Sequence, residues 1–357
     1  MINFELKEAL AQFFEDAGNF TVKPIGAGLI NHTLLASNTV SGKSYILQKI
    51  NSSVFKYPPG IMDNIEAVSS YLKEHFPGYT FLSPVKTSTG ANYYQKGNDY
   101  YRVFPFMEGS VSYVVADNPS QAKLAAGAFG QFSAMLNHFP VDKLHISIPD
   151  FHNLEKRFSD FQDALIKGDQ QRIVKTKSIA DELLQYGYLV DTYRQIVNSA
   201  ECRKRVMHHD TKISNVLFNK EGQVICLVDL DTIMPGYFIS DVGDMMRNYL
   251  SAAGEEETDF SKIEVRMDYY RALASGYLSQ MGPSLTATEK GHFAYSGLFI
   301  TYMQALRFYT DYILNDIYYP VSHPEHNKIR TQNQLALLEK LKEKEGEMQE
   351  FADALDL

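Results

Sequence analysis

The segment at residues 206–219, VMHHDTKISNVLFN, gathers polar side chains that can do chemistry just before an apolar strand. Asp210 is followed five residues later by Asn215, and the next apolar run, VICLVDLDTIMPG, leads into Asp229 and Asp231. A carboxylate can take the proton of an attacking hydroxyl group, and amide and carboxylate oxygens are ligands that Mg²⁺ prefers. The spacing therefore indicates phosphoryl transfer, with Asp210 as the base and with Asn215 and Asp229 as metal ligands.

Simpler explanations of this segment stay open from the residues alone. His208 and His209 could bind zinc, but no HxxxH or CxxC motif supplies further ligands, so His208 is better explained as a support for the loop. A charged loop can also carry an Asp…Asn spacing by chance. Asp241, in SDVGD, is either a second acid or, as we prefer, a carboxylate at a helix start that binds the backbone of the catalytic loop.

A glycine turn lies upstream of this core. Residues 20–50 alternate short β-like runs with turns, and GAG places Gly26 and Gly28 in the first of these turns. A GxG sequence is common in plain hairpins, so the motif alone is weak. In this position, however, its backbone N–H groups could cover the phosphates of a nucleotide.

Strand alternation determines which of these side chains share a face. Successive side chains of a strand point to opposite faces, so Asp229 and Asp231 would lie on the same side of a regular strand and reach one cleft. Kinase-like folds pair a strand lysine with a helix acid, for which Glu66 has the right position. The strand SYILQKIN offers Gln48 at that register instead, and Lys49 is expected to point the other way.

The elements that must position these residues fall into two regions. A β-rich part with helical spacing at residues 61–76 is followed, from about residue 117, by a part dominated by helical periods. A chain of 357 residues also fits two cores better than one. We therefore expect an α+β fold with a nucleotide-binding lobe at residues 1–107 and a catalytic and substrate-binding lobe at residues 108–357.

Two helical segments of the second region have alternative explanations. The most apolar stretch, at residues 292–309, is interrupted by Gln304 and Arg307, which favours a buried helix over a membrane span. The last helical segment, at residues 333–351, places its leucines on one side. That pattern predicts a helix docked on the second lobe, because a coiled coil needs three or four heptads.

Composition excludes several classes of protein. A net charge of −9 and a pI near 5.6 argue against a nucleic-acid-binding protein, which needs a surplus of Lys and Arg on at least one face. The first residues lack the pattern of a signal peptide, so we expect a cytoplasmic protein. Cys202 and Cys226 belong to no CxxC motif and are expected to be buried thiols.

These motifs resemble the aminoglycoside phosphotransferase/choline kinase superfamily and, more closely, the N-acetylhexosamine 1-kinases. The closer resemblance covers most of the chain, through GAGLINHT, YILQKINSSVF, MDNIE, HDTKISNVLF, VDLDTIMPG, LRFYTDYILNDIYY and PEHNKIRTQ. It implies a bilobal protein-kinase-like fold, with a small β-rich N-lobe and a larger, mainly helical C-lobe. It also implies that ATP and Mg²⁺ serve to phosphorylate the anomeric hydroxyl of N-acetylglucosamine or N-acetylgalactosamine.

The resemblance extends to individual residues. It implies that Asp210 is the base, that Asn215 and Asp229 bind magnesium, and that the sugar contacts Asp210, Lys212, Asp231, Arg307 and Tyr318. It places the nucleotide against Gly26, Gly28, Gln48, Glu66, Phe104, Phe106 and Met107, and Gln is ordinary at the position of Gln48. From the residues alone, Arg307 is either an internal salt bridge or a ligand donor, and Lys212 either neutralises transition-state charge or is merely exposed.

Two other functions remain open at this point. The acceptor could be another small alcohol, such as choline, an aminoglycoside or a different hexose, and choline would need an aromatic cage for its ammonium group. A nucleotide-binding pseudokinase is the alternative outside enzymes. Because all three presumed catalytic and metal positions are filled, the sequence favours an enzyme that binds a nucleotide and a small sugar, without nucleic-acid or membrane partners.

Overall fold

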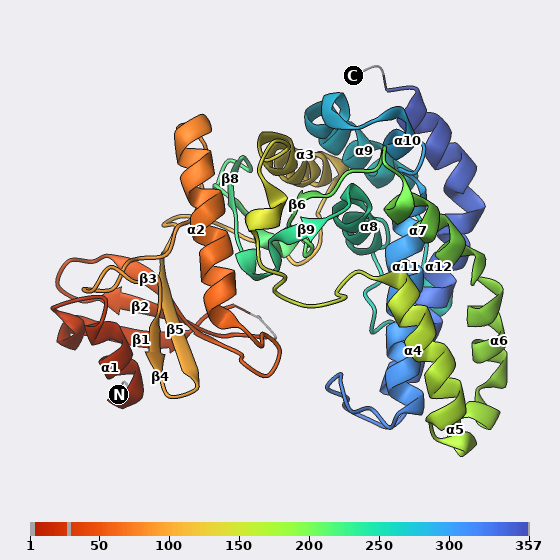
Figure 1. The fold of residues 1–357 in the computed structure, drawn as a ribbon, viewed down its shortest axis with the longest axis horizontal. Coiled ribbons are helices and arrows are strands. Elements are labelled where there is room, and N and C mark those ends of the chain that lie inside the picture. Colours follow the sequence, from red (N-terminus) through yellow and green to blue (C-terminus); the bar gives the residue numbers. More distant parts are fainter. Residues whose placement is uncertain (1–3, 27–29, 356–357) are drawn as a thin grey trace. The chain divides into compact units, whose positions relative to one another are not determined.

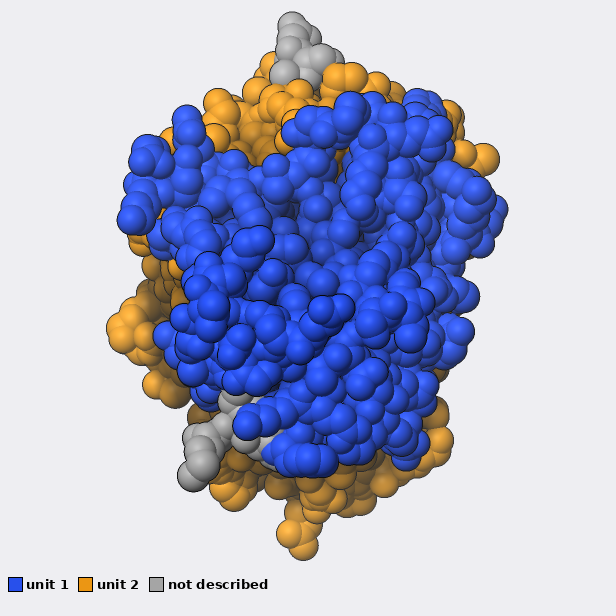
Figure 2. Space-filling model, turned by 90° about the vertical axis from the view of Figure 1, so that its left-hand side faces the viewer, with its two compact units in different colours: residues 1–111, 138–149, 217–235 blue, residues 112–137, 150–216, 236–357 orange. Residues whose placement is uncertain are grey.

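A computed structural model of the chain describes residues 4–26 and 30–355 (Figure 1). The chain forms two compact units, which are coloured separately in Figure 2. Unit 1 consists of residues 1–111, 138–149 and 217–235, and unit 2 consists of residues 112–137, 150–216 and 236–357. Both units are discontinuous in sequence, and the expected lobe boundary at residue 107 remains a prediction.

Unit 1 is built around a five-stranded antiparallel sheet with the order β1-β2-β3-β5-β4. Its strands are β1 (Phe20–Pro24), β2 (His32–Asn38), β3 (Ser44–Ile50), β4 (Tyr94–Lys96) and β5 (Asp99–Pro105). The predicted meander over residues 20–50 is confirmed. The strand β4 was not predicted, because three residues are too short to show an alternating pattern.

The two faces of this sheet have different neighbours. Helix α1 (Phe4–Ala11) covers one face, where Leu10 packs in a core with Leu34, Leu47 and Val103. Helix α2 (Pro58–His75) runs beside the sheet (Figure 1) and contacts β5 through Met62. Side chains of β3 and β5 therefore point alternately toward α1 and toward α2.

The rest of unit 1 carries the predicted metal-binding strand. β7 (Val216–Phe218) and β8 (Val224–Leu227) form a hairpin, and β9 (Met234–Gly236) follows. Between β8 and β9, Asp229 has a left-handed backbone with φ of 60°, and residues Leu230–Thr232 form a 3₁₀ turn. The expectation that a regular strand carries Asp229 and Asp231 on one face is therefore wrong, because the strand ends before both residues.

Unit 2 is mainly helical. Its elements are α3 (Pro119–Met135), α4 (Leu154–Lys167), α5 (Gln170–Lys175), α6 (Lys177–Gln185), α7 (Tyr188–Asn198), β6 (Arg205–Met207), α8 (Phe238–Tyr249), α9 (Met267–Met281), α10 (Ala287–Lys290), α11 (Tyr295–Ile313) and α12 (His326–Asp353). Helix α11 is buried almost all round, as predicted for the apolar stretch. Within residues 4–26 and 30–355, no helix combines the length and apolarity needed to cross a membrane.

The C-terminal helix also has the predicted role. In α12, Leu335, Leu338 and Leu341 are all buried, and α12 packs along α11. The prediction of a docked helix is confirmed. Both cysteines are buried thiols, as expected.

Candidate active site

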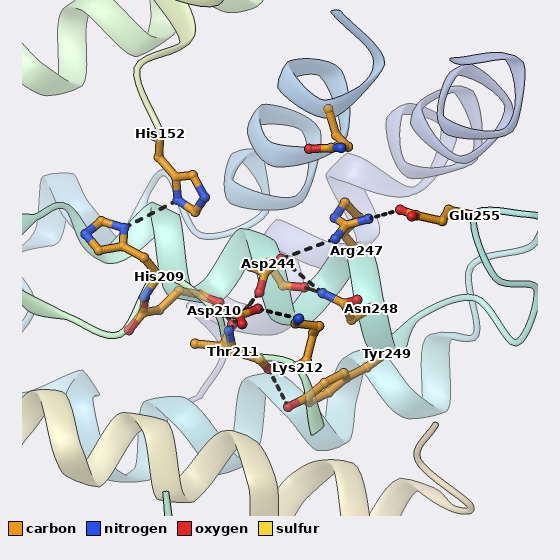
Figure 3. A network of polar contacts seen from close by, with 12 residues as sticks. His152, His209, Asp210, Thr211, Lys212, Asp244, Arg247, Asn248, Tyr249 and Glu255 are labelled. Atoms are coloured by element: carbon orange, nitrogen blue, oxygen red, sulfur yellow. Dashed lines mark hydrogen bonds and ion pairs between the residues drawn. The ribbon is translucent and has the colours of Figure 1, made fainter. Parts of the chain in front are cut away.

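The catalytic loop of unit 2 follows β6 and brings together Asp210, Lys212 and Asn215. Figure 3 shows Asp210 beside Lys212. The Oδ2 atom of Asp210 accepts a hydrogen bond of 3.0 Å from the side-chain amide of Asn215. The Oδ1 atom lies 3.1 Å from the Nζ atom of Lys212. The Asp210 side chain is 23% exposed, so a ligand hydroxyl group can still reach its carboxylate.

The orientation of Asn215 suits a metal ligand. Its Nδ2 atom donates both to the Asp210 carboxylate and, over 2.8 Å, to the Asp210 backbone carbonyl. With the nitrogen engaged on that side, the amide oxygen is the atom turned away from Asp210. An amide oxygen and a carboxylate, such as Asn215 and Asp229 each offer within its own unit, are oxygen donors of the kind that Mg²⁺ takes, and Mg²⁺ completes its shell with phosphate and water.

Asp241, near the start of α8, holds the catalytic loop by its backbone. Its carboxylate accepts from the N–H of His208 over 3.0 Å and from the N–H of His209 over 2.8 Å. Burial raises the pKa of Asp241 to about 7, while the two N–H groups act in the opposite direction. The interpretation of Asp241 as a backbone-binding carboxylate is confirmed.

Asp244 is a second loop anchor that sequence reasoning missed. Its Oδ2 atom accepts from the backbone N–H of Thr211 over 2.7 Å, and its Oδ1 atom accepts from Asn248 over 3.0 Å. Burial raises the pKa of Asp244, and Arg247 opposes that shift from 3.6 Å away. The signal was available in SDVGD, because residues three apart share one helix face.

His208 supports the loop as predicted. Its side chain is fully buried, its ring packs edge-on against Phe129 at 5.2 Å, and its Nδ1 atom accepts from the N–H of Asp210 over 3.4 Å. The next residue, His209, has a left-handed backbone with φ of 64°. Such strained backbone is costly for a non-glycine residue and concentrates at functional sites.

A histidine outside the motif extends this site. The Nδ1 atoms of His209 and His152 lie 3.4 Å apart, and the ring of His152 stacks on that of Phe151 at 4.4 Å (Figure 3). Burial lowers the pKa of His152 well below its usual value, and the nearby His209 and Arg307 act in the same direction. No local pattern in the sequence marks His152.

Arg307 and Tyr318 lie together, in the same part of unit 2. The Arg307 guanidinium faces the rings of Phe151, Tyr318 and Tyr319 at 5.9, 5.8 and 5.4 Å, and it donates to Gln304 over 3.2 Å. Among the residues that the structure describes, no carboxylate forms an ion pair with Arg307. The alternative of an internal salt bridge therefore has no support among the described residues, and the interpretation of Arg307 as a ligand donor stays a prediction.

These side chains line a pocket of about 350 Å³ in unit 2, which is large enough for a small ligand. Two guanidinium groups reach it, from Arg157 and Arg307. Its carboxylates already have partners: Asp160 pairs with Lys156, Asp163 pairs with Lys167, and Asp311 accepts from the N–H groups of residues 318 and 319.

The strand residues of unit 1 follow the predicted register. Lys49 points toward α1, where its Nζ atom lies 3.2 Å from Glu5 and 2.7 Å from Asp99. Gln48 points to the α2 side and accepts, over 3.0 Å, from the Nε atom of Arg102, its partner on β5. Sequence reasoning missed Arg102, although a charged residue within the apolar strand YYRVFPF was a visible signal.

The other predicted nucleotide contacts in unit 1 mostly have partners within the protein. Glu66 pairs with Lys86 over 3.0 Å in an exposed ion pair, so it has no strand lysine as partner. The Phe104 ring lies 5.1 Å from the Arg102 guanidinium. The N–H of Phe106 already donates to the sheet, and the carbonyl of Met107 accepts in a turn. Gly26 has a φ of 76°, and Gly28 lies outside the described residues.

A small antiparallel sheet and a larger helical part that carries an Asp…Asn loop define a protein-kinase-like fold, of mixed α+β class. The chain belongs to the APH phosphotransferase enzyme family, whose model matches residues 21–277. The family model thus spans the sheet, the catalytic loop and α8.

Solved structures agree with this fold at low sequence identity. An aminoglycoside phosphotransferase from Alicyclobacillus acidocaldarius is 16% identical, with a TM-score of 0.64 over 99% of this chain and 97% of that one. A microcompartment-associated aminopropanol kinase is 15% identical, with a TM-score of 0.66 over 96% and 98%. A spectinomycin phosphotransferase, solved with ADP and spectinomycin, is 13% identical, with a TM-score of 0.55 over 94% and 92%.

Proposed function

We propose that the protein is an N-acetylhexosamine 1-kinase, which transfers the γ-phosphate of ATP to the anomeric hydroxyl of N-acetylglucosamine or N-acetylgalactosamine. The phosphotransferase family supports the reaction type, and a fold neighbour solved with ADP supports an adenine nucleotide. The motifs shared with the N-acetylhexosamine 1-kinases support the acceptor. Residues 1–107 are proposed as the nucleotide-binding lobe and residues 108–357 as the catalytic lobe.

The surroundings of Arg307 are the observation that carries the choice of acceptor. A guanidinium that faces three aromatic rings and forms no ion pair with a described carboxylate has hydrogen-bond donors beyond the one used on Gln304, and these can serve a ligand. Sugars offer hydroxyl and carbonyl acceptors to such donors and an apolar ring face to an aromatic side chain. Arg307 and Tyr318 together supply both kinds of contact.

The charges of this pocket are balanced. Its lining includes three cationic groups, from Arg157, Lys167 and Arg307, and three carboxylates, from Asp160, Asp163 and Asp311. Arg157 itself lies 3.7 Å from Asp160. The choice of a neutral N-acetylhexosamine over choline or an aminoglycoside therefore rests on the shared motifs and on Arg307.

In the proposed mechanism, Asp210 accepts a hydrogen bond from the anomeric hydroxyl and finally takes its proton. Asn215 fixes the Asp210 carboxylate, and Lys212 lies close enough to offset the negative charge that develops beside it. Asn215 and Asp229 would hold Mg²⁺, which neutralises phosphate charge when bound. Backbone N–H groups around Gly26 and Gly28 would cover the phosphates, and the segment from Phe104 through Phe106 to Met107 would contact adenine.

A panel of acceptors tests this proposal. ADP release is measured with ATP and Mg²⁺ in the presence of N-acetylglucosamine, N-acetylgalactosamine, glucose, choline, ethanolamine or an aminoglycoside. The N-acetylhexosamines are expected to give the highest kcat/KM. Asp210→Asn should abolish most of the signal, and Asp181→Asn, at an exposed i,i+4 pair far from the loop in sequence, should not. A preference for choline or an aminoglycoside would refute the sugar assignment.

A further inference from the structure

Arg102 is a buried cation in the part of unit 1 that is expected to face a nucleotide. It lies on β5 directly opposite Gln48 on β3, and its side chain is only 2% exposed. Its Nε atom donates to Gln48, and its Nη1 atom lies 3.6 Å from the sulfur of Met62 on α2. Lys49 points to the opposite face, so Arg102 supplies the positive charge on the α2 side of these two strands.

The partner of Arg102 is Asp231, in the turn that follows the predicted metal ligand. The Nη1 atom of Arg102 lies 2.5 Å from Oδ1 of Asp231, whose side chain is 3% exposed. The other oxygen, Oδ2, accepts from the side-chain amide of Asn31 over 2.5 Å. Asn31 in turn accepts from the backbone N–H of Asn51, at the end of β3. Both carboxylate oxygens of Asp231 are therefore engaged inside unit 1.

These contacts join three segments. Asp231 is two residues from Asp229, Asn31 follows the glycine turn of GAG, and Arg102 lies in the strand that leads to Phe104. Asp229 sits in a left-handed backbone at the start of the 3₁₀ turn that contains Asp231. Holding Asp231 therefore holds the backbone that aims the Asp229 carboxylate.

We infer that Arg102 and Asp231 are positioning residues for the magnesium–nucleotide complex, acting through the turn that carries Asp229. The inference rests on the proposed phosphotransfer, in which Asp229 is a metal ligand. Arg102 connects the sheet to the carboxylate of Asp231, and Gln48 holds the Arg102 guanidinium. Gln48 alone could not do this, because its side chain carries no charge. It also gives Asp231 a structural partner in place of the sugar contact that the family resemblance implies.

A purely structural salt bridge would be a weak reason to bury these charges. Taking an arginine and a carboxylate out of water costs several kcal/mol per ion, which a well-packed apolar pair would avoid. Residues that orient a metal ligand, in contrast, change metal affinity or activity by about 10–100-fold when they are mutated. The two roles therefore predict different consequences for nucleotide binding.

The test is calorimetric binding of a non-hydrolysable ATP analogue to the full chain, with Mg²⁺ and with EDTA. In Asp231→Asn and Arg102→Lys, the affinity measured with Mg²⁺ is expected to fall by about 10–100-fold, and the affinity in EDTA by less than about threefold. Asn31→Ala tests the second contact of Asp231 should either of these variants fail to fold. Arg102→Lys, which keeps the charge but not the planar fork, should bind more tightly than Arg102→Met.

Glu289→Gln is a matched control. It disrupts another buried arginine–carboxylate pair, in which Arg205 and Glu289 of unit 2 are 1% and 0% exposed. This variant should lower stability while leaving nucleotide affinity unchanged with and without Mg²⁺. Equal losses with Mg²⁺ and with EDTA in the Asp231 and Arg102 variants would overturn the inference, and so would wild-type affinity.

Sugar kinetics separate this inference from the proposed function. Asp231→Asn should leave the KM for N-acetylhexosamine within about threefold of wild type, and a selective rise in that KM would restore Asp231 as a sugar contact and overturn the positioning role. If the wild-type chain binds the magnesium nucleotide but phosphorylates no hexosamine, the proposed function fails, and the binding series still decides the role of Arg102 and Asp231.

Discussion

Arg102 in unit 1 is buried and Arg307 in unit 2 is partly exposed, and the two side chains contact different kinds of partner. Arg102 forms an ion pair with the buried carboxylate of Asp231, and Gln48 accepts from its Nε atom. Arg307 faces three aromatic rings, and Gln304 is its hydrogen-bond acceptor. The charge of Arg102 is thus compensated within the fold, while the charge of Arg307 is proposed to serve a ligand.

This difference separates positioning from binding. An arginine with a buried carboxylate partner fixes the backbone that its partner belongs to, and its removal leaves an uncompensated charge. An arginine held by ring faces keeps planar hydrogen-bond donors directed at whatever enters the pocket. We expect mutations of Arg102 to act on the nucleotide and on stability, and mutations of Arg307 to act on the sugar.

The largest predicted effect on turnover concerns Asp210. Asp210→Asn should lower kcat by roughly 10²–10⁴-fold, because a general base typically contributes that much. The fold should be retained, since the amide can still contact Asn215 and Lys212. Steady-state kinetics and circular dichroism check this, and a folded Asp210→Asn enzyme with wild-type turnover would remove the mechanism.

Removing Arg102 should lower the free energy of unfolding more than removing Arg307. Arg102→Met leaves the Asp231 carboxylate buried without its cation and should cost about 3–5 kcal/mol. Arg307→Met removes ring contacts of a partly exposed side chain and should cost about 1 kcal/mol or less. Urea unfolding measures both, and the double variant Arg102→Met/Asp231→Leu should recover most of the loss. Equal costs for the two single variants would contradict the comparison.

The KM values for the two substrates should also distinguish the two arginines. Arg307→Lys keeps the charge but loses the planar fork, so the KM for N-acetylhexosamine should rise by about tenfold, with little change in the KM for ATP. Arg102→Lys should show the reverse pattern. Two-substrate kinetics on both variants provide the measurement. The same changes in the two KM values for both variants would mean that Arg102 and Arg307 do not act on different substrates.

The smallest predicted effect concerns pH and the half-buried His152. The folded-state pKa of His152 lies well below its usual 6.5. As the pH falls past 6.5, His152 therefore takes up a proton in the unfolded chain but stays neutral in the folded chain. The stability that neutral His152 contributes is therefore present above pH 6.5 and is lost as the pH falls below that value. The loss is at most about 1.4 kcal/mol per pH unit.

A variant isolates that contribution. Unfolding midpoints of the wild type should decline more steeply between pH 7 and pH 5 than those of His152→Gln, which has no proton to bind. Parallel curves would show that His152 has the same pKa in the folded and unfolded chains, which would contradict the prediction.

The sequence predicted the parts of the molecule that depend on local patterns. Alternation was enough to place Gln48 and Lys49 on opposite faces of β3, and both expectations are confirmed. Helical spacing identified α11 and α12 as buried and docked helices. The preferred role of Asp241 followed from its position at a helix start, and its two hydrogen bonds to loop N–H groups confirm it.

The rest depends on contacts that no local pattern encodes. Asn31 and Asp231 meet across 200 positions of sequence, and Arg102 reaches the same carboxylate from a third segment. The expectation that a regular strand carries Asp229 and Asp231 was wrong because β8 ends at Leu227 and Asp229 takes a left-handed backbone, which alternation cannot anticipate. His152 enters the site from outside the catalytic motif, through a ring contact.

The most direct test of the central claim is to locate the transferred phosphate. Phosphorus NMR of the product, formed from ATP, Mg²⁺ and N-acetylgalactosamine or N-acetylglucosamine, shows to which proton the phosphorus couples. The account predicts a phosphate coupled to the anomeric proton, and Asp210→Asn should give none. A phosphate coupled to another sugar position, or no sugar phosphate at all from a chain that binds the magnesium nucleotide, would contradict it.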